Sequence, residues 1–132
     1  MSVNSRDEKI IQIRPEISSA QVLGDTSSVE AFQNTVLRPL LKFQNEHIVS
    51  TFLTELKNKK QDFNQLNNLE KASSIDNHFK SNMALKQQLL GIVIGLFTAK
   101  ELITYHKDSS IFNKRIFSML KERLKDQLIS LN

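Results

Sequence analysis

The sequence predicts an all-α fold: a compact bundle of five or six helices preceded by an extended N-terminal arm. Three Gly and two Pro in 132 residues are too few for the many tight turns of an all-β domain. Apolar residues recur every three or four positions along most of the chain. The uncharged segment 89–97 would be apolar on every side as a helix, yet it is shorter than the roughly 20 residues that cross a membrane. We therefore expect one domain built around a buried central helix, with no membrane span.

Residues 1–26 are expected to form the arm, because they are polar and show no helical period. Pro15 excludes a helix interior and favours an extended conformation for Arg14. The arm is interpreted either as an extended segment on the surface of the domain or of a neighbouring subunit, or as a partly disordered terminus. The helical domain is then 27–132.

The first helix should begin at a capping box formed by Ser27 and Glu30. Pro39 predicts a kink within it. Gln44 reads as a break, and Asn45 is expected to cap a second helix, although one long kinked helix over 28–60 is an alternative. The apolar stripes of these two helices are Phe32, Val36, Leu37, Leu40 and Leu41, followed by Ile48, Val49, Phe52, Leu53 and Leu56.

The second helix should end at the lysines of 57–60, since cations are favourable at a helix C-terminus. A polar connection follows, from which Phe63 and Leu66 should point inwards. Asn68 is expected to cap the third helix. Its buried stripe is expected to be Leu69, Ala72, Ile75 and Phe79.

The central helix should start at Ser81 or Asn82 and carry two stripes. One is apolar. The other contains Ala84, Gly91 and Gly95, and small residues on one face allow a second backbone to come close. We therefore predict that another helix crosses at Gly91 and Gly95; the alternative is that Gly95 only marks the end of the helix.

A second capping box, Thr98 with Glu101, should start a short helix. Ser109 or Ser110 should cap the last helix, over about 111–131. Its apolar arc is broad for a helix at the edge of a small domain, which favours a homodimer with a self-complementary contact. The candidate interface residues are Ile111, Phe117, Leu128 and Ile129.

Residues with catalytic or metal-binding chemistry are few. The absence of Cys excludes disulfides and thiolate chemistry, and it fits a reducing compartment such as the cytoplasm. His47, His78 and His106 fall on three different predicted helices without the spacing of helix-borne metal sites. We therefore expect no catalytic residue, metal or cofactor, and three ordinary surface or boundary histidines.

The formal net charge of +4 is ordinary for a small protein. Lys114, Lys121 and Lys125 share one side of the last helix and are candidate phosphate contacts. The alternative is a solvated helix face, since Glu122 and Asp126 dilute the charge. Nucleic acid is therefore an alternative partner and not the leading one.

Several short strings occur together: Ile13-Arg14-Pro15, Leu37-Arg38-Pro39, Gly91-Ile92-Val93-Ile94-Gly95 before Phe97-Thr98, and Asn113-Lys114-Arg115 with Lys121-Glu122-Arg123. Together they resemble a group of short, uncharacterised helical proteins from Bacteroidetes, over nearly the whole chain. The resemblance implies a helical fold and no activity. Some of those proteins carry a glyoxalase label, but that chemistry on its usual fold needs βαβββ modules and a His/Glu/Gln metal site, which this sequence lacks.

The leading functional hypothesis is a non-enzymatic helical module for protein–protein interaction, homodimeric and cytoplasmic. One alternative is a nucleic-acid-associated protein using the basic face of the last helix. The other is a small-ligand binder or enzyme with a pocket between helices.

Overall fold

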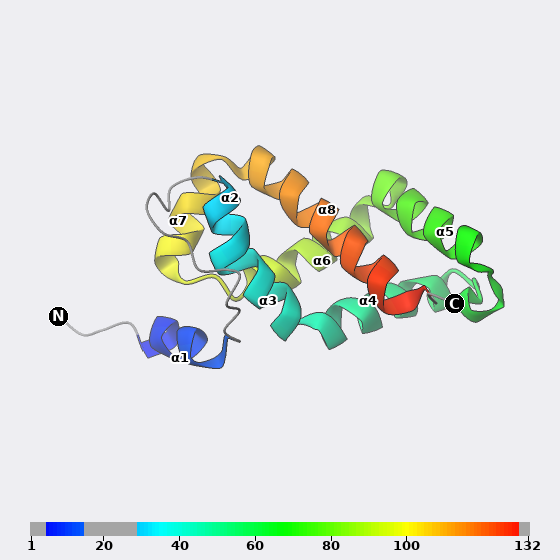
Figure 1. The fold of residues 1–132 in the computed structure, drawn as a ribbon, viewed down its shortest axis with the longest axis horizontal. Coiled ribbons are helices and arrows are strands. Elements are labelled where there is room, and N and C mark those ends of the chain that lie inside the picture. The colour runs from blue at the N-terminus through cyan, green and yellow to red at the C-terminus, as the bar shows by residue number, and fades with distance from the viewer. Residues whose placement is uncertain (1–4, 15–28, 130–132) are drawn as a thin grey trace.

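The computed structural model describes residues 5–14 and 29–129, and in these ranges the chain is all-α, as predicted (Figure 1). The central helix is α6 (Met83–Ile94), which contacts α4 (Asn45–Asn58), α5 (Asn68–Ser81) and α8 (Ser109–Leu128). Leu85, Leu89 and Val93 of α6 are at most 1% exposed. The predicted central helix and its buried face are thus confirmed, but burial on every side is wrong, because Gly91 is exposed and α6 ends at Ile94, within the apolar segment. None of the helices described is long and apolar enough to span a membrane.

The first predicted helix forms as three joined parts: α2 (Val29–Phe32), the π-helical η2 (Gln33–Leu37) and α3 (Arg38–Phe43). The backbone is helical through both junctions, and the Arg38 N–H donates to the Gln33 carbonyl, five residues back. A π turn is wider than an α turn, which relieves the crowding between the Pro39 ring and the carbonyl four residues before it. The irregularity expected at Pro39 therefore takes the form of a π segment. Ser27 of the expected capping box lies outside the described residues.

The predicted break at Gln44 is confirmed, so the single long helix is excluded. The Gln44 side-chain amide donates to the Ile92 carbonyl at 3.1 Å, which ties the break to α6. Asn45 does not cap α4, contrary to expectation. Its side chain instead contacts α8, where it accepts from Arg123 at 2.9 Å and donates to Gln127 at 3.1 Å.

The C-terminus of α4 is closed by a Schellman motif with a lysine where glycine is usual. The Gln61 N–H donates to the Leu56 carbonyl and the Lys60 N–H to the Lys57 carbonyl, both at 2.9 Å. Lys60 has φ 60°, in the left-handed region that is unfavourable for residues with a Cβ.

Replacing Lys60 by glycine should raise the free energy of unfolding by about 0.5–1 kcal/mol, because glycine adopts this φ without strain. Chemical denaturation of Lys60→Gly against the parent chain measures the change. The control is Lys59→Gly, one residue earlier at φ −91°, which should lower stability. If Lys60→Gly raised the free energy of unfolding no more than Lys59→Gly does, the left-handed φ of Lys60 would not be a source of strain.

The segment between α4 and α5 contains η3 (Phe63–Gln65), and Phe63 is buried as predicted. Asn67, and not Asn68, caps α5, with a complete capping box to Glu70. The helix therefore starts one residue earlier than expected. Leu69 is 81% exposed, so its predicted place in the core is wrong, because the side chain faces solvent in the first turn of α5.

The predicted helix crossing at Gly91 and Gly95 is wrong for the part of the chain described. Ala84, Gly91 and Gly95 are all exposed, and a Cβ added to Gly91 would have no heavy atom within 4 Å. Gly95 is the C-cap of α6, which was the alternative interpretation. The stripe is the solvent side of α6, because α4, α5 and α8 pack on its other sides.

The capping box of Thr98 and Glu101 is confirmed and starts α7 (Ala99–Lys107). Asp108, and not Ser109 or Ser110, is the N-cap residue of α8, without a side-chain cap bond. Leu128 and Ile129 are partly buried against the core, and the chain after Ile129 lies outside the described residues.

The N-terminal arm is not extended where it is described, because Ser5–Ile13 forms a helix, α1. With α1, and with α2, η2 and α3 counted as one, the described residues contain seven helices instead of five or six. The period was missed because Ile10 is the one buried residue of α1, while Ile11 and Ile13 are 54% and 47% exposed. The helix ends before Arg14, as Pro15 requires.

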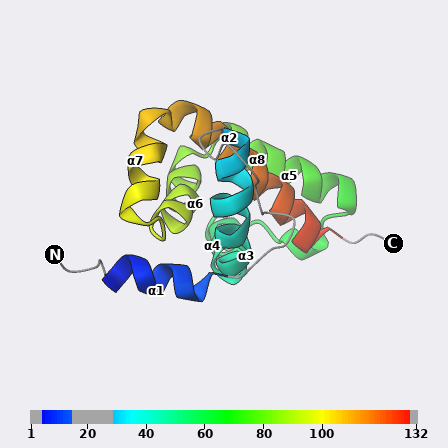
Figure 2. The ribbon, with the colours of Figure 1, turned by 60° about the vertical axis from the view of Figure 1, so that its left-hand side comes forward.

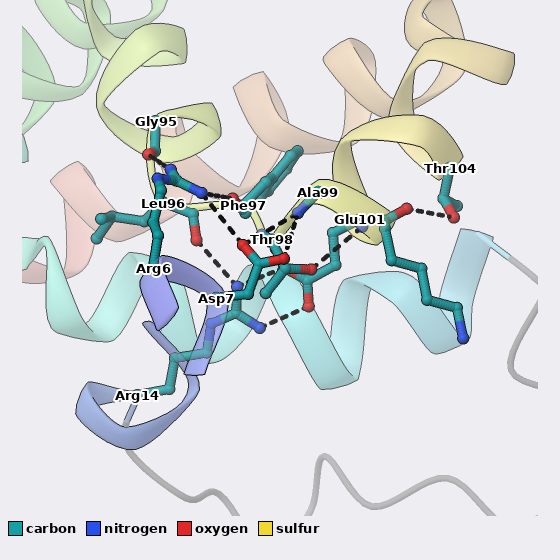
Figure 3. A network of polar contacts seen from close by, with 11 residues as sticks. Arg6, Asp7, Arg14, Gly95, Leu96, Phe97, Thr98, Ala99, Glu101 and Thr104 are labelled. Atoms are coloured by element: carbon teal, nitrogen blue, oxygen red, sulfur yellow. Dashed lines mark hydrogen bonds and ion pairs between the residues drawn. The ribbon is translucent and has the colours of Figure 1, made fainter. Parts of the chain in front are cut away.

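Helix α1 lies beside the turn between α6 and α7 (Figure 2), and charged side chains attach it there (Figure 3). The Arg6 guanidinium donates to the carbonyls of Gly95 at 2.8 Å and Phe97 at 3.0 Å, at the C-terminus of α6. The Asp7 carboxylate accepts from the Ala99 N–H at 3.1 Å, at the N-terminus of α7. A cation, Arg6, thus lies at a helix C-terminus and an anion, Asp7, at a helix N-terminus, as the helix dipoles favour.

Arg14 completes this attachment. It donates to the Leu96 carbonyl at 3.0 Å and forms a two-pronged ion pair with Glu101, with an Nη1–Oε2 distance of 2.6 Å. Only 8% of the Arg14 side chain and 16% of the Glu101 side chain are exposed. Since Glu101 also closes the capping box of α7, one carboxylate serves both the helix start and the docking of α1.

Candidate functional site

The basic face predicted on the last helix forms one wall of a groove. An open groove of about 430 Å³ lies between α5 and α8, which pack against each other. It is lined by aromatic rings of both helices and edged by lysines. We call it the lysine groove; its residues are Asp76, Phe79 and Lys80 of α5, Lys114, Phe117, Ser118 and Lys121 of α8, and the adjoining Lys86 of α6 and Lys125 of α8.

Asp76 is the one acidic residue of the lysine groove, and it holds two of the lysines. Its Oδ1 atom lies 2.8 Å from Nζ of Lys125 and 3.6 Å from Nζ of Lys121. The close Lys125 ammonium lowers the pKa of the Asp76 carboxyl below its ordinary value, against a smaller effect of burial. Asp76 is therefore ionised at neutral pH, and it neutralises part of the lysine charge.

The aromatic residues give the lysine groove an apolar lining. The rings of Phe79 and Phe117 lie 6.4 Å apart between centroids. Phe79 is 7% exposed, and the Lys86 ammonium lies 4.7 Å from the centroid of the Phe117 ring. A cation over a ring face is favourable, and it also covers that face. The partly buried Phe117 therefore provides the apolar surface of the groove, while Phe79 is nearly covered.

The acids and arginines of α8 point elsewhere, which the sequence alone did not reveal. Glu122 and Asp126 line a different groove, together with Arg38 of α3. Arg115 donates to Gln33 at 2.8 Å, and Arg123 donates to Asn45. The three lysines of α8 therefore lie on the α5 side, whereas its two arginines contact Gln33 and Asn45.

Sequence reasoning found three members of this site, Lys114, Lys121 and Lys125, and missed Lys80 and Lys86. The i, i+3, i+4 spacing of Asp76, Phe79 and Lys80 places them on one helix face, and this could be predicted from the sequence. The packing of α5 on α8 could not be predicted, because no local sequence pattern specifies which helices become neighbours.

The candidate interface residues are mostly covered by the protein itself. Phe117, Leu128 and Ile129 pack partly buried against the core, while Ile111 is 48% exposed. The apolar arc of α8 is therefore used largely within the chain, and the residues do not form one exposed patch.

The three histidines do not meet. His47 on α4 and His106 on α7 are exposed, and His78 on α5 is buried. Within 5–14 and 29–129 no group of three His, Cys, Asp or Glu side chains is placed to hold a metal. An open groove of about 540 Å³ lies beside His78, with Leu66 and Leu69 in its lining.

His78 belongs to a polar network with Asn82 and Glu55. The Asn82 amide nitrogen donates to Glu55 Oε2 at 2.6 Å and lies 3.1 Å from His78 Nδ1, while its oxygen accepts from the Leu85 N–H. Both amide hydrogens and the oxygen are thus engaged, so His78 Nδ1 accepts and its proton is on Nε2. Burial lowers the pKa of His78, and the Glu55 charge only partly offsets this.

Stability should therefore fall as the pH drops below the ordinary His pKa of about 6.5. In that range the unfolded chain binds a proton that folded His78 resists, so acid favours unfolding; above it this contribution is complete. Denaturation at a series of pH values should show this slope between about pH 7 and pH 5. It should flatten in His78→Gln and persist in His47→Gln. An unchanged slope in His78→Gln would remove His78 as its source.

The chain was also compared with known proteins: it matches no family model, and neither the curated proteins nor the solved structures give a match. The resemblance to helical proteins from Bacteroidetes stays a prediction.

Proposed function

We propose that this chain is a non-enzymatic helical interaction module whose contact surface is the lysine groove. The observation that carries the proposal is the concentration of charge. Three lysines and one aspartate line the groove and two further lysines, Lys86 and Lys125, adjoin it, so this set carries a formal charge of +4. Such a field attracts an anionic partner and speeds its association.

A protein is the leading partner, and nucleic acid is the alternative. The two rings in the groove support a partner that brings apolar side chains as well as negative charge. The lysines alone would also suit phosphates. A cytoplasmic location and a homodimer accompany the proposal as predictions, and light scattering tests the homodimer through the solution mass.

The test is reversal of two groove charges that make no ion pair among the described residues, in Lys80→Glu/Lys114→Glu. Fluorescence anisotropy would measure the binding of labelled poly-L-glutamate and of a single-stranded oligonucleotide. We expect the reversal to weaken binding by about tenfold or more at low salt. The control, Lys42→Glu/Lys100→Glu, changes two exposed lysines outside the groove by the same charge. Equal losses in the two variants would mean that net charge alone matters, and the proposal would fail.

A further inference from the structure

We infer that the partner of the lysine groove is an acidic protein segment bearing large apolar side chains, whose carboxylates replace Asp76 on Lys121 and Lys125. This inference rests on the proposed function, and it adds the chemistry of the partner and an internal competitor. In the free protein Asp76 occupies the position that a partner carboxylate would take.

The ion pairs of Asp76 show that the two ammonium groups can bind one carboxylate, at 2.8 Å from Lys125 and 3.6 Å from Lys121. The three side chains are partly exposed, by 47% for Asp76, 40% for Lys121 and 34% for Lys125, although the Asp76 Oδ1 atom itself is covered. An incoming carboxylate can therefore reach the same lysines. Because exposed ion pairs contribute little net free energy, the exchange of one carboxylate for another meets little resistance.

The apolar lining of the groove favours a protein segment over a nucleic acid as the partner. Phe79 and Phe117 lie between the lysines, so an apolar side chain entering there would be flanked by positive charge. Single-stranded nucleic acids bind by stacking bases on open ring faces. Here the Phe117 face carries Lys86 at 4.7 Å and Phe79 is 7% exposed, so no ring face is open to a base, whereas an apolar side chain needs only contact with the partly buried Phe117. Arg115 and Arg123, which would best grip phosphates, are engaged outside the groove.

It follows that neutralising Asp76 should strengthen binding. Asp76→Asn keeps the shape of the side chain, removes the competing charge and releases both lysines. The affinity for an acidic, apolar peptide should rise about threefold to tenfold. Asp126→Asn is the matched control, because Asp126 lies on the same helix as the lysines but lines the other groove. Circular dichroism would establish that both variants fold.

The probes are a synthetic peptide of alternating glutamate and leucine blocks, the same peptide with glutamine for glutamate, the same peptide with alanine for leucine, and a single-stranded oligonucleotide. We expect Asp76→Asn to bind the first peptide more tightly than the parent chain and Asp126→Asn, and both altered peptides to bind weakly. Unchanged or weaker binding by Asp76→Asn would overturn the inference. Equal binding of the alanine peptide, or tighter binding of the oligonucleotide, would also overturn it while leaving the lysine groove as a contact surface. If Lys80→Glu/Lys114→Glu binds every probe like its control, the proposed function itself fails.

Discussion

Leu89→Ala should lower the free energy of unfolding by about 3–4 kcal/mol. Leu89 lies in the middle of α6 and is 0% exposed, and α6 packs against α4, α5 and α8. Shortening it removes buried apolar surface and leaves a cavity that these neighbours cannot close without moving, because each is fixed by its own packing. Urea denaturation, with the midpoint and slope fitted together, measures the loss.

The matched control is the same substitution at Leu69, which is 81% exposed in the first turn of α5. Leu69→Ala should change the stability by no more than about 0.5 kcal/mol. Both positions are leucines in helices and both appear in apolar patterns of the sequence, so the pair isolates burial from helix propensity. If Leu69→Ala lowered the free energy of unfolding as much as Leu89→Ala, Leu69 would have to be buried in solution, contrary to the structure.

The elements predicted correctly are those encoded by neighbouring residues. The capping box of Thr98 and Glu101 needs only four consecutive positions, and the break at Gln44 follows from the polar Gln-Asn pair. The buried stripe of α4 follows from the helical period, which gave Ile48, Phe52 and Leu56 correctly. Local hydrogen bonding and periodicity are sufficient in these cases, because the same chemistry holds whatever packs beside them.

The errors arose where a neighbour distant in sequence decides the outcome. The arm was predicted as extended because α1 buries a single isoleucine, and the contacts that hold it come from residues about ninety positions away. The glycine stripe of α6 was assigned a partner helix, although small residues suit a solvent-facing side equally well. The lysines of α8 were recognised, but Asp76 and Lys80 joined them only through the packing of α5.

Breaking the ion pair of Arg14 with Glu101 should be the other large effect. Glu101→Gln should cost about 3 kcal/mol, because it leaves the nearly buried Arg14 charge without its counter-ion. Glutamine can still accept the Thr98 N–H bond of the capping box, so the loss would report the ion pair more than the start of α7. Hydrogen exchange should show α1 losing protection before the rest of the chain, since Arg14 attaches it to the α6–α7 turn.

A double-mutant cycle with Arg14→Met separates the pair from its surroundings. If the two side chains act together, the double variant should be more stable than the sum of the single losses predicts, by about 2 kcal/mol. The control is Lys59→Met, which breaks the exposed pair of Lys59 with Glu55 at 3.8 Å and should cost less than about 0.5 kcal/mol. Additive losses at Arg14 and Glu101 would mean that water already screens the pair. The attachment of α1 would then depend on Arg6, Asp7 and the buried Ile10, and the N-terminal helix would detach more readily than the buried ion pair implies.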